Sequence, residues 1–263
     1  MPIDCDIYPY TAASNPLKNL FPPWLQEGGV EAMITRLADD NVRNRLRTAL
    51  EAEGLNNFGR IPDWDAIRIS ISPDMPQYAG RTIADIAAER NIDGFNMALD
   101  YIVEDRGQTR VLVGSIAEDD VKDFVRSPDV MIGSDGNSVA PYGTTGQGKP
   151  HPRFYGTFAK VLGQYARDEE LLPLHQAVWK MTGASARALG LKNRGTLQPG
   201  NAADITIFDP VTIAEQATYE DPHQFASGIH QVIVNGTTVL RDGEHTGALA
   251  GRTLRRQTDF AAA

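Results

Sequence analysis

Asp135 is the residue whose type and position point most directly to chemistry. It follows the apolar run 130–132, which is typical of the end of a buried strand, and Gly133 and Gly136 on either side allow the backbone to turn. An acidic residue at the carboxyl end of a strand in a (β/α) barrel lies in the mouth where the chemistry takes place. A carboxylate there can hold a metal-activated water or act as a general base. The alternative is a plain turn, because Asp and Gly favour turns for backbone reasons.

Other groups that bind metals are sparse. The five histidines stand at positions 151, 175, 223, 230 and 245 without a His-x-His pair, and Cys5 is the one cysteine. Zinc sites use three or four His, Cys or carboxylate ligands, and the sequence offers Asp135 as the single candidate. We therefore expect one part of a metal site without the rest of it, and poor zinc binding by the chain alone.

A second candidate is Arg153, which follows Pro152 at the end of a stretch, 136–152, rich in Gly, Pro, Ser and Thr. That composition predicts a polar loop, in which an exposed arginine is usually only solubilising. The functional alternative is a clamp on a substrate carboxylate, because the planar guanidinium can donate two parallel hydrogen bonds. His151 has no second histidine nearby, so we expect it to fix the loop rather than to bind metal.

Composition excludes several classes of partner. The net charge of −9 and the pI near 5.0 argue against a nucleic-acid or anionic-membrane partner, which would require a surplus of Lys and Arg. No apolar run approaches the roughly 20 residues that span a bilayer. A single cysteine makes no internal disulfide, and the acidic N-terminus lacks the features of a signal peptide. These features predict a soluble, cytoplasmic protein.

The hydrophobic pattern predicts a mixed α/β segment that ends near Leu191 and a small all-β unit after it. Pro16, Pro22 and Pro23 indicate an extended loop, and Asn235-Gly236 predicts a type I′ hairpin. Helical patterns cover 28–53, 82–104, 118–124, 158–167 and 174–189. Strand patterns cover 3–10, 66–71, 111–113, 129–134, 195–197, 203–208, 232–234 and 237–240.

Several motifs together resemble one family. An Asp-x-Tyr-Pro-Tyr segment at 6–10, a His-Pro-Arg-x-x-Gly-Thr-Phe segment at 151–158 and a Gly-x-Leu-x-Pro-Gly run at 195–200 carry the resemblance. Further matching segments are 131–136, 179–182, 202–205, 208–210 and 234–236. With them, nearly the whole chain resembles the C-terminal half of an N-acyl-D-amino-acid deacylase (D-aminoacylase) of the amidohydrolase superfamily.

The resemblance implies a fold. Members of the family have a metal-dependent (β/α)8 TIM-like barrel and a small β-sandwich built from both chain ends. This chain would be an α/β protein that supplies the last two barrel strands and an inserted subdomain in residues 1–191. Residues 192–263 would form the C-terminal portion of the β-sandwich.

The resemblance also implies site roles. Asp135 would act as general base on a zinc-bound water and then as general acid toward the leaving amine. Arg153 would clamp the substrate carboxylate, and Tyr8 and Ser14 match positions that contact the same carboxylate. The Tyr8 ring could equally pack against the barrel wall. Asp135 is also the one metal ligand that the chain could provide, since the family's other Zn²⁺ ligands precede the segment at 6–10.

The expected activity is zinc-dependent hydrolysis of the amide bond of a small-molecule N-acyl-D-amino acid. The chain alone is expected to be inactive, and open sheet edges predict oligomerisation or aggregation unless a complementary N-terminal chain is present. A truncated, non-catalytic remnant and a subunit of a split enzyme are alternatives. Another amidohydrolase activity, like that of a hydantoinase or dihydroorotase, is a third, although the His-Pro-Arg segment speaks against it.

Overall fold

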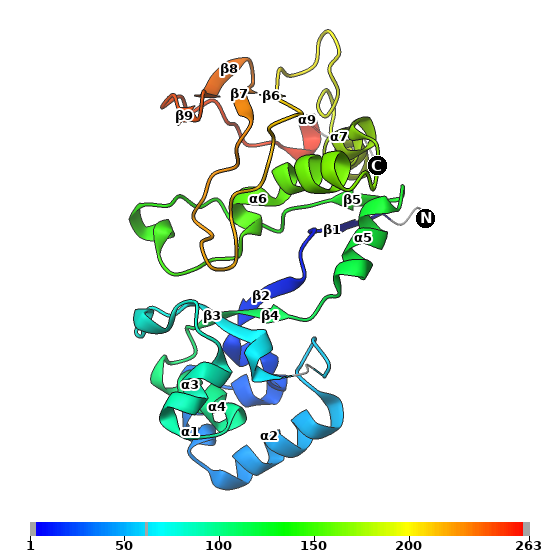
Figure 1. The fold of residues 1–263 in the computed structure, drawn as a ribbon. Coiled ribbons are helices and arrows are strands. Elements are labelled where there is room, and N and C mark those ends of the chain that lie inside the picture. Colours follow the sequence, from blue (N-terminus) through cyan, green and yellow to red (C-terminus); the bar gives the residue numbers. More distant parts are fainter. Residues whose placement is uncertain (1–3, 61–62, 260–263) are drawn as a thin grey trace.

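The computed structural model describes residues 4–60 and 63–259, and the chain forms an α/β structure in three parts (Figure 1). A helical lobe, residues 12–114, lies at one end, a layer of two strands and several helices lies in the middle, and a small sheet lies at the other end. Ile3, at the start of the first predicted strand, lies outside the described residues. None of the described helices is both long and apolar enough to cross a membrane.

The helical lobe packs four helices against a three-stranded antiparallel sheet of order β2-β4-β3. Its strands are β2 (Ala12–Pro16), β3 (Ile67–Ile71) and β4 (Arg110–Gly114). Its helices are α1 (Val30–Leu37), α2 (Asp40–Glu53), α3 (Ile83–Arg90) and α4 (Gly94–Glu104). Short 3-10 turns, η1 (Leu17–Leu20), η2 (Pro23–Gln26), η3 (Trp64–Ala66) and η4 (Pro76–Tyr78), connect them. The lobe encloses a continuous core of buried apolar side chains.

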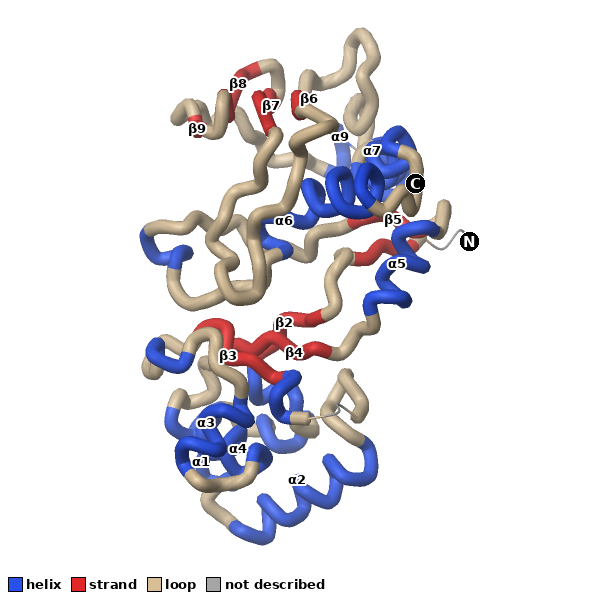
Figure 2. Tube along the Cα trace, in the orientation of Figure 1, coloured by secondary structure: helices blue, strands red, loops and turns tan. Residues whose placement is uncertain are grey.

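The middle layer is built on two parallel strands, β1 (Cys5–Ile7) and β5 (Val130–Ile132), in the register Cys5 to Val130. Parallel neighbours need a long crossover, and here the helical lobe and α5 (Glu118–Arg126) form it (Figure 2). After β5 and the 3-10 turn η5 (Gly143–Gly146), the helices follow in order: α6 (Arg153–Lys160), the π-helix η6 (Val161–Asp168), α7 (Leu174–Met181) and α8 (Gly183–Leu189).

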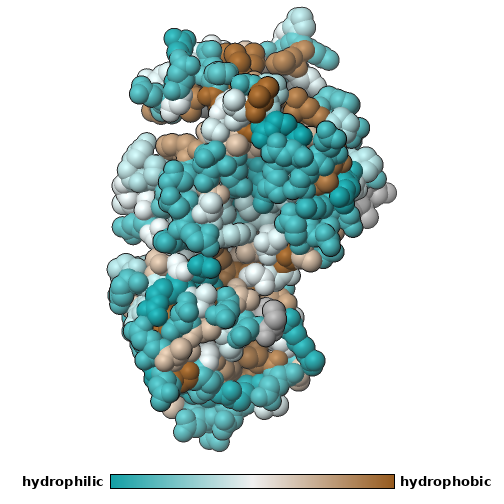
Figure 3. Space-filling view, viewed as in Figure 1, coloured by the Kyte–Doolittle hydropathy of each residue, from teal (hydrophilic) through white to brown (hydrophobic). Residues whose placement is uncertain are grey.

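The third part is an antiparallel sheet of order β6-β7-β8-β9, followed by the short helix α9 (Arg256–Asp259). Its strands are β6 (Ile205–Phe208), β7 (Ile229–Val234), β8 (Thr237–Arg241) and β9 (Glu244–His245). Asn235 and Gly236 have φ of 48° and 80°, as the predicted type I′ turn requires. None of these strand residues is buried within the described chain, and Figure 3 shows apolar surface over this end of the molecule.

A long segment between β6 and β7, residues 209–228, leaves the sheet and returns to it; we call it the strap. It runs down past α6 toward the helical lobe (orange in Figure 1). Ile213 of the strap is 1% exposed and belongs to the core of the middle layer. The strap therefore belongs structurally to the middle layer, although the sequence places it between two strands of the sheet.

Several predicted elements need correction. The patterns 28–53, 82–104 and 174–189 are each two helices, because the Asp39 side chain caps α2, Asn91 adopts left-handed geometry after α3, and Thr182 breaks the last pair. Residues 195–197 form no strand. Conversely, β2 was missed because Pro16 pointed to a loop; an edge strand tolerates the proline, which has no N–H to donate.

Candidate functional site

Asp135 lies just beyond β5, and Tyr8 lies just beyond its parallel neighbour β1. The carboxyl ends of parallel strands meet at one edge, so the pairing of β1 with β5 brings these two positions together. The Gly133 N–H extends the pairing by donating to the Ile7 carbonyl at 3.0 Å. Asp135 has φ of 44°, a left-handed conformation that Asp tolerates better than most residues. Its side chain is 68% exposed, so the carboxylate is accessible at this edge.

Arg153 does not lie in a loop as predicted. It is the first residue of α6, and it is 5% exposed. Its Nε donates to the Asp135 carbonyl at 2.9 Å, and its Nη2 pairs with Asp135 Oδ2 at 2.8 Å. The third guanidinium nitrogen, Nη1, is buried and has no hydrogen-bond partner among the described residues. A buried cationic donor without a partner is costly, so this nitrogen favours an anionic or carbonyl acceptor from outside the chain.

The Tyr8 ring lies under this guanidinium. The Arg153 Cζ is 4.6 Å from the ring centroid, within the range of a cation–π contact. Burial raises the pKa of the Tyr8 phenol, and the positive charge of Arg153 opposes that rise. The ring also packs edge-on to His151 at 6.1 Å, so it contributes packing as well as a hydroxyl. The structure thus gathers Asp135, Arg153 and Tyr8 into one cluster.

No hydrogen bond between described residues joins Ser14 to this cluster. It lies in β2 opposite Leu112, and its Oγ accepts a long hydrogen bond of 3.4 Å from Arg110 Nη2. Its part in binding a carboxylate stays a prediction.

His151 holds the start of α6 to the helical lobe. The side chain is completely buried; its Nδ1 accepts the Arg153 backbone N–H at 3.0 Å, and its Nε2 lies 2.8 Å from the Ala12 carbonyl. The carbonyl cannot donate, so Nε2 carries the proton. Burial lowers the pKa of His151 to about 3, which keeps the ring neutral near neutral pH. These contacts agree with a role in fixing the segment.

Three residues beside the cluster were missed by sequence reasoning: Tyr10, Tyr219 and Glu215. The rings of Tyr10 and Tyr219 pack edge-on to His151, with centroid distances of 5.0 and 5.3 Å. The Tyr10 hydroxyl donates to Glu215 Oε1 at 2.5 Å. Tyr10 belongs to the Asp-x-Tyr-Pro-Tyr motif and could have been singled out. Glu215 is 205 residues away in the chain, and no local pattern connects it to the site.

The residues present do not by themselves fit a metal ion. Within 4–60 and 63–259, no group of three or more His, Cys, Asp or Glu side chains is arranged to hold one. Cys5 is exposed, and Nδ1 of His223 lies 2.8 Å from the Tyr155 hydroxyl. The described residues therefore supply no complete metal site.

With this geometry described, comparison with known proteins decides the family. Residues 21–240 match the amidohydrolase family. The chain belongs to it. The match extends to the branch indicated by the motifs, since the chain is 42% identical over 181 residues to a D-aminoacylase from Alcaligenes xylosoxydans xylosoxydans, covering 69% of this chain and 35% of that protein. This family member thus spans about a third of the length of that curated relative.

Solved structures agree. A crystal structure of D-aminoacylase superposes with a TM-score of 0.69 at 35% identity, over 95% of this chain and 42% of that one. N-acyl-D-glutamate deacylase from Bordetella bronchiseptica, solved with zinc and a phosphonate inhibitor that mimics the tetrahedral intermediate, superposes with a TM-score of 0.66 at 32% identity, over 92% and 40% of the two chains. The solved relatives of this family member thus include a D-aminoacylase and an N-acyl-D-glutamate deacylase, the second complexed with zinc.

Proposed function

We propose that this chain serves the hydrolysis of the amide bond of an N-acyl-D-amino acid, within a metal-dependent amidohydrolase. The relatives named above support the reaction class. The observation that carries the proposal for this chain is the buried Nη1 of Arg153, which lacks a partner among the described residues. Every N-acyl amino acid has a carboxylate beside the scissile amide, and such a group would satisfy this nitrogen.

In this proposal Arg153 and Tyr8 bind the substrate carboxylate. The guanidinium is already held on two of its nitrogens by Asp135, so its position is fixed before a ligand arrives. A fixed donor loses little conformational entropy on binding, which favours affinity and orientation. The Tyr8 ring supports the guanidinium face, and Ser14 is a further candidate contact from β2.

Asp135 acts as the base in the same proposal. Its exposed carboxylate accepts a proton from the attacking water as the new C–O bond forms at the acyl carbon. It then gives that proton to the leaving nitrogen as the C–N bond breaks. The products are a carboxylic acid and a free amino acid, and Asp135 ends in its starting state.

We further propose that the metal is zinc, as in the solved N-acyl-D-glutamate deacylase. The described residues offer Asp135 as a ligand but no group of three, so the other ligands would come from a complementary N-terminal polypeptide. Consistent with that, we propose that β1 and β5 are the last two strands of a barrel and that the helical lobe is its inserted subdomain. Residues 192–263 would then contribute one portion of a β-sandwich.

The test is the affinity of the chain for two matched compounds: an N-acetyl-D-amino acid and its primary amide, which lacks the carboxylate. Arg153→Lys keeps the charge but loses the planar fork. Hydrogen bonds to charged groups are worth about 1.5–3 kcal/mol, so calorimetry should show a roughly ten- to hundredfold loss of affinity for the acid. Affinity for the amide should change little.

The matched control is Arg126→Lys, an exposed arginine of α5 that pairs with Asp123. It should bind both compounds as the parent does. Equal losses for acid and amide in Arg153→Lys would mean that Arg153 supports the fold and does not recognise the carboxylate, and the deacylase proposal would lose its main support in this chain.

A further inference from the structure

The strap packs against α6 and η6 where two glycines leave room for it. A Cβ added at Gly156 would clash with the Glu215 carboxylate, and one added at Gly163 would clash with the Ile213 carbonyl oxygen. The strap therefore approaches the helix more closely than any side chain at these two positions would permit. Gly156 is also the glycine of the His-Pro-Arg-x-x-Gly-Thr-Phe segment. The close approach of Glu215 explains why this position of the segment holds a residue without a side chain.

Further contacts fix the strap along its length. Nη1 of Arg167, near the end of η6, donates to the carbonyls of Ile213 at 2.7 Å and Val211 at 3.1 Å. Farther along, Nδ1 of His223 lies 2.8 Å from the Tyr155 hydroxyl, and Glu220 pairs with Arg68 of the helical lobe at 3.7 Å. The strap thus joins the helices of the middle layer to the helical lobe.

Glu215 is the charged group that the strap brings into the interior. Its Oε1 accepts from the Tyr10 hydroxyl at 2.5 Å, and the Lys160 ammonium lies 4.3 Å from the centroid of the same Tyr10 ring. Burial raises the pKa of the Glu215 carboxyl, while the Tyr10 hydrogen bond and the charge of Lys160 oppose the rise. The reaction proposed above gives this half-buried group no role.

A continuous series of contacts leads from Glu215 to Arg153. Glu215 fixes the Tyr10 hydroxyl, and the Tyr10 ring packs edge-on to His151 at 5.0 Å. Tyr219, four residues after Glu215 on the strap, packs against the same imidazole at 5.3 Å. The imidazole in turn accepts the backbone N–H of Arg153 at 3.0 Å. Two strap residues, Glu215 through Tyr10 and Tyr219 directly, therefore fix the imidazole that accepts the backbone N–H at the start of α6.

We propose that Glu215 is a positioning residue of the Arg153 site: it acts through Tyr10 and His151 to fix where the guanidinium lies. The inference rests on the proposed function, because it assumes that Arg153 binds a carboxylate. Side chains that orient a binding group without touching the ligand commonly affect affinity, since a small displacement of a rigid donor weakens its hydrogen bond to the ligand.

The test compares Glu215→Gln with the parent chain in two measurements: amide hydrogen exchange followed by NMR, and affinity for the N-acetyl-D-amino acid and its amide. Changes away from a ligand typically alter coupling by a factor of about two to thirty. We expect exchange at the Arg153 amide to accelerate, and affinity for the acid to fall, by factors in that range. Affinity for the amide, and exchange at Ala159 farther along α6, should stay as in the parent.

Two further variants sharpen the test. Tyr10→Phe removes only the hydroxyl and should reproduce both effects, and in that background Glu215→Gln should add nothing, because the two residues act in series. Glu220→Gln makes the same chemical change at a strap residue whose side chain is 70% exposed, and it should leave both measurements unchanged.

The outcomes that overturn the inference are separate from those that overturn the proposed function. The positioning role is excluded if amide exchange at Arg153 is unchanged both in Tyr10→Phe and in folded Glu215→Gln. It is also excluded if exchange accelerates equally at Arg153 and Ala159, because that would indicate general loosening of α6. If Arg153→Lys binds acid and amide as the parent does, the carboxylate role fails instead. The exchange measurement needs no ligand and still reports whether Glu215 fixes the start of α6.

Discussion

The helical lobe and the sheet β6–β9 are stabilised in opposite ways. Helices and strands of the lobe enclose side chains such as Leu99, Ile102 and Val111, which have no exposed surface. The sheet has antiparallel pairing, with one register shift in each of the β6–β7 and β7–β8 ladders, and a type I′ hairpin, yet none of its described strand residues is buried. Antiparallel pairing can therefore form without a buried core of its own, and this sheet contacts the core of the middle layer only through partly buried residues such as Phe208 and Ile229.

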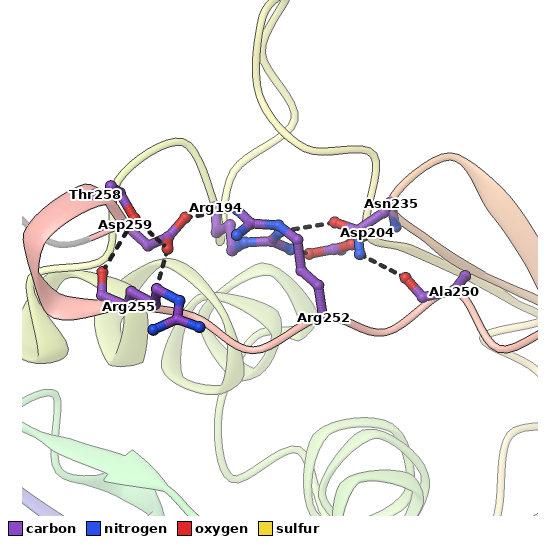
Figure 4. A network of polar contacts seen from close by, with 8 residues as sticks. All are labelled: Arg194, Asp204, Asn235, Ala250, Arg252, Arg255, Thr258 and Asp259. Atoms are coloured by element: carbon purple, nitrogen blue, oxygen red, sulfur yellow. Dashed lines mark hydrogen bonds and ion pairs between the residues drawn. The ribbon is translucent and has the colours of Figure 1, made fainter.

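Polar contacts take the place of a core at one end of the sheet (Figure 4). Asp204 pairs with Arg194 and accepts the Asn235 backbone N–H at 2.8 Å, so a single carboxylate joins the hairpin to the segment after α8. The Asn235 side chain donates to the Ala250 carbonyl at 2.7 Å. These contacts fix geometry, but an ion pair at a partly exposed position contributes only about 1 kcal/mol. The sheet should therefore be the less stable of the two regions.

The largest expected difference in the free energy of unfolding comes from replacing an isoleucine by alanine in each of the two regions. Ile102→Ala removes a fully buried side chain from the lobe and should lower the free energy of unfolding by about 2–5 kcal/mol. Ile233→Ala acts on a half-buried residue of β7 and should cost about 1 kcal/mol or less. Urea denaturation followed by circular dichroism measures both. Equal losses would mean that the sheet has a core as effective as that of the lobe.

Acid should weaken the junction where His151 holds α6 to the lobe. The pKa of His151 is about 3 in the folded chain and about 6.5 when unfolded, so below pH 6.5 the unfolded chain binds the extra proton. The contribution of His151 is therefore full above pH 6.5 and is lost progressively as pH falls toward 3. At pH 5 the loss is about 2 kcal/mol, at about 1.4 kcal/mol per pH unit.

Denaturation of the parent chain and two variants at pH 7 and pH 5 checks this. His151→Gln should be less stable at pH 7 but should lose less on acidification, because it has no buried imidazole to protonate. His175→Gln, at an exposed position, should follow the parent chain. An identical pH dependence in the parent and His151→Gln would show that the imidazole is not held neutral.

The smallest expected effect is on amide exchange in the sheet when the Arg194–Asp204 ion pair is weakened. Asp204→Asn should accelerate amide exchange in β7 and β8 by an amount equivalent to about 1 kcal/mol or less, and exchange in β3 and β4 should not change. Raising ionic strength should act in the same direction on the parent, because salt screens the Arg194 pair. Asp242→Asn, at the next turn, is the matched control. Salt-independent exchange in β7 would imply that the sheet does not depend on charge.

Local patterns predicted most of the elements, and long-range contacts explain what they missed. The strands 66–71 and 111–113 and the Asn235-Gly236 hairpin could be predicted because alternation and turn chemistry act within a few residues. The helix breaks at Asn91 and Thr182 were missed because apolar residues recur at helical spacing on both sides of each break. The strand β2 was missed because an edge position, which only the assembled sheet defines, makes Pro16 acceptable.

In the candidate site, too, local motifs identified some residues and long-range contacts explain those that were missed. Asp135, Arg153 and Tyr8 lie in motifs, so a resemblance found them, and the structure brings them together. The burial of Arg153 could not be predicted from a stretch rich in Gly and Pro, because it depends on packing against Tyr8 and His151. Glu215 gave no signal in the sequence, since its partner Tyr10 belongs to the first ten residues.

The π-helix η6 has a consequence for how the length of this segment can vary. It continues α6 without interruption, but its wider turns hold an extra residue relative to α-helical spacing. Because these turns already hold one residue more than α-helical turns do, inserting a further residue between 161 and 164 would rotate the following side chains by roughly a quarter turn around the axis. Tyr165 and Arg167 would then face away from the groups that they now contact. An insertion here should therefore be tolerated as poorly as a substitution in the core, because only Asp168 of this segment is exposed.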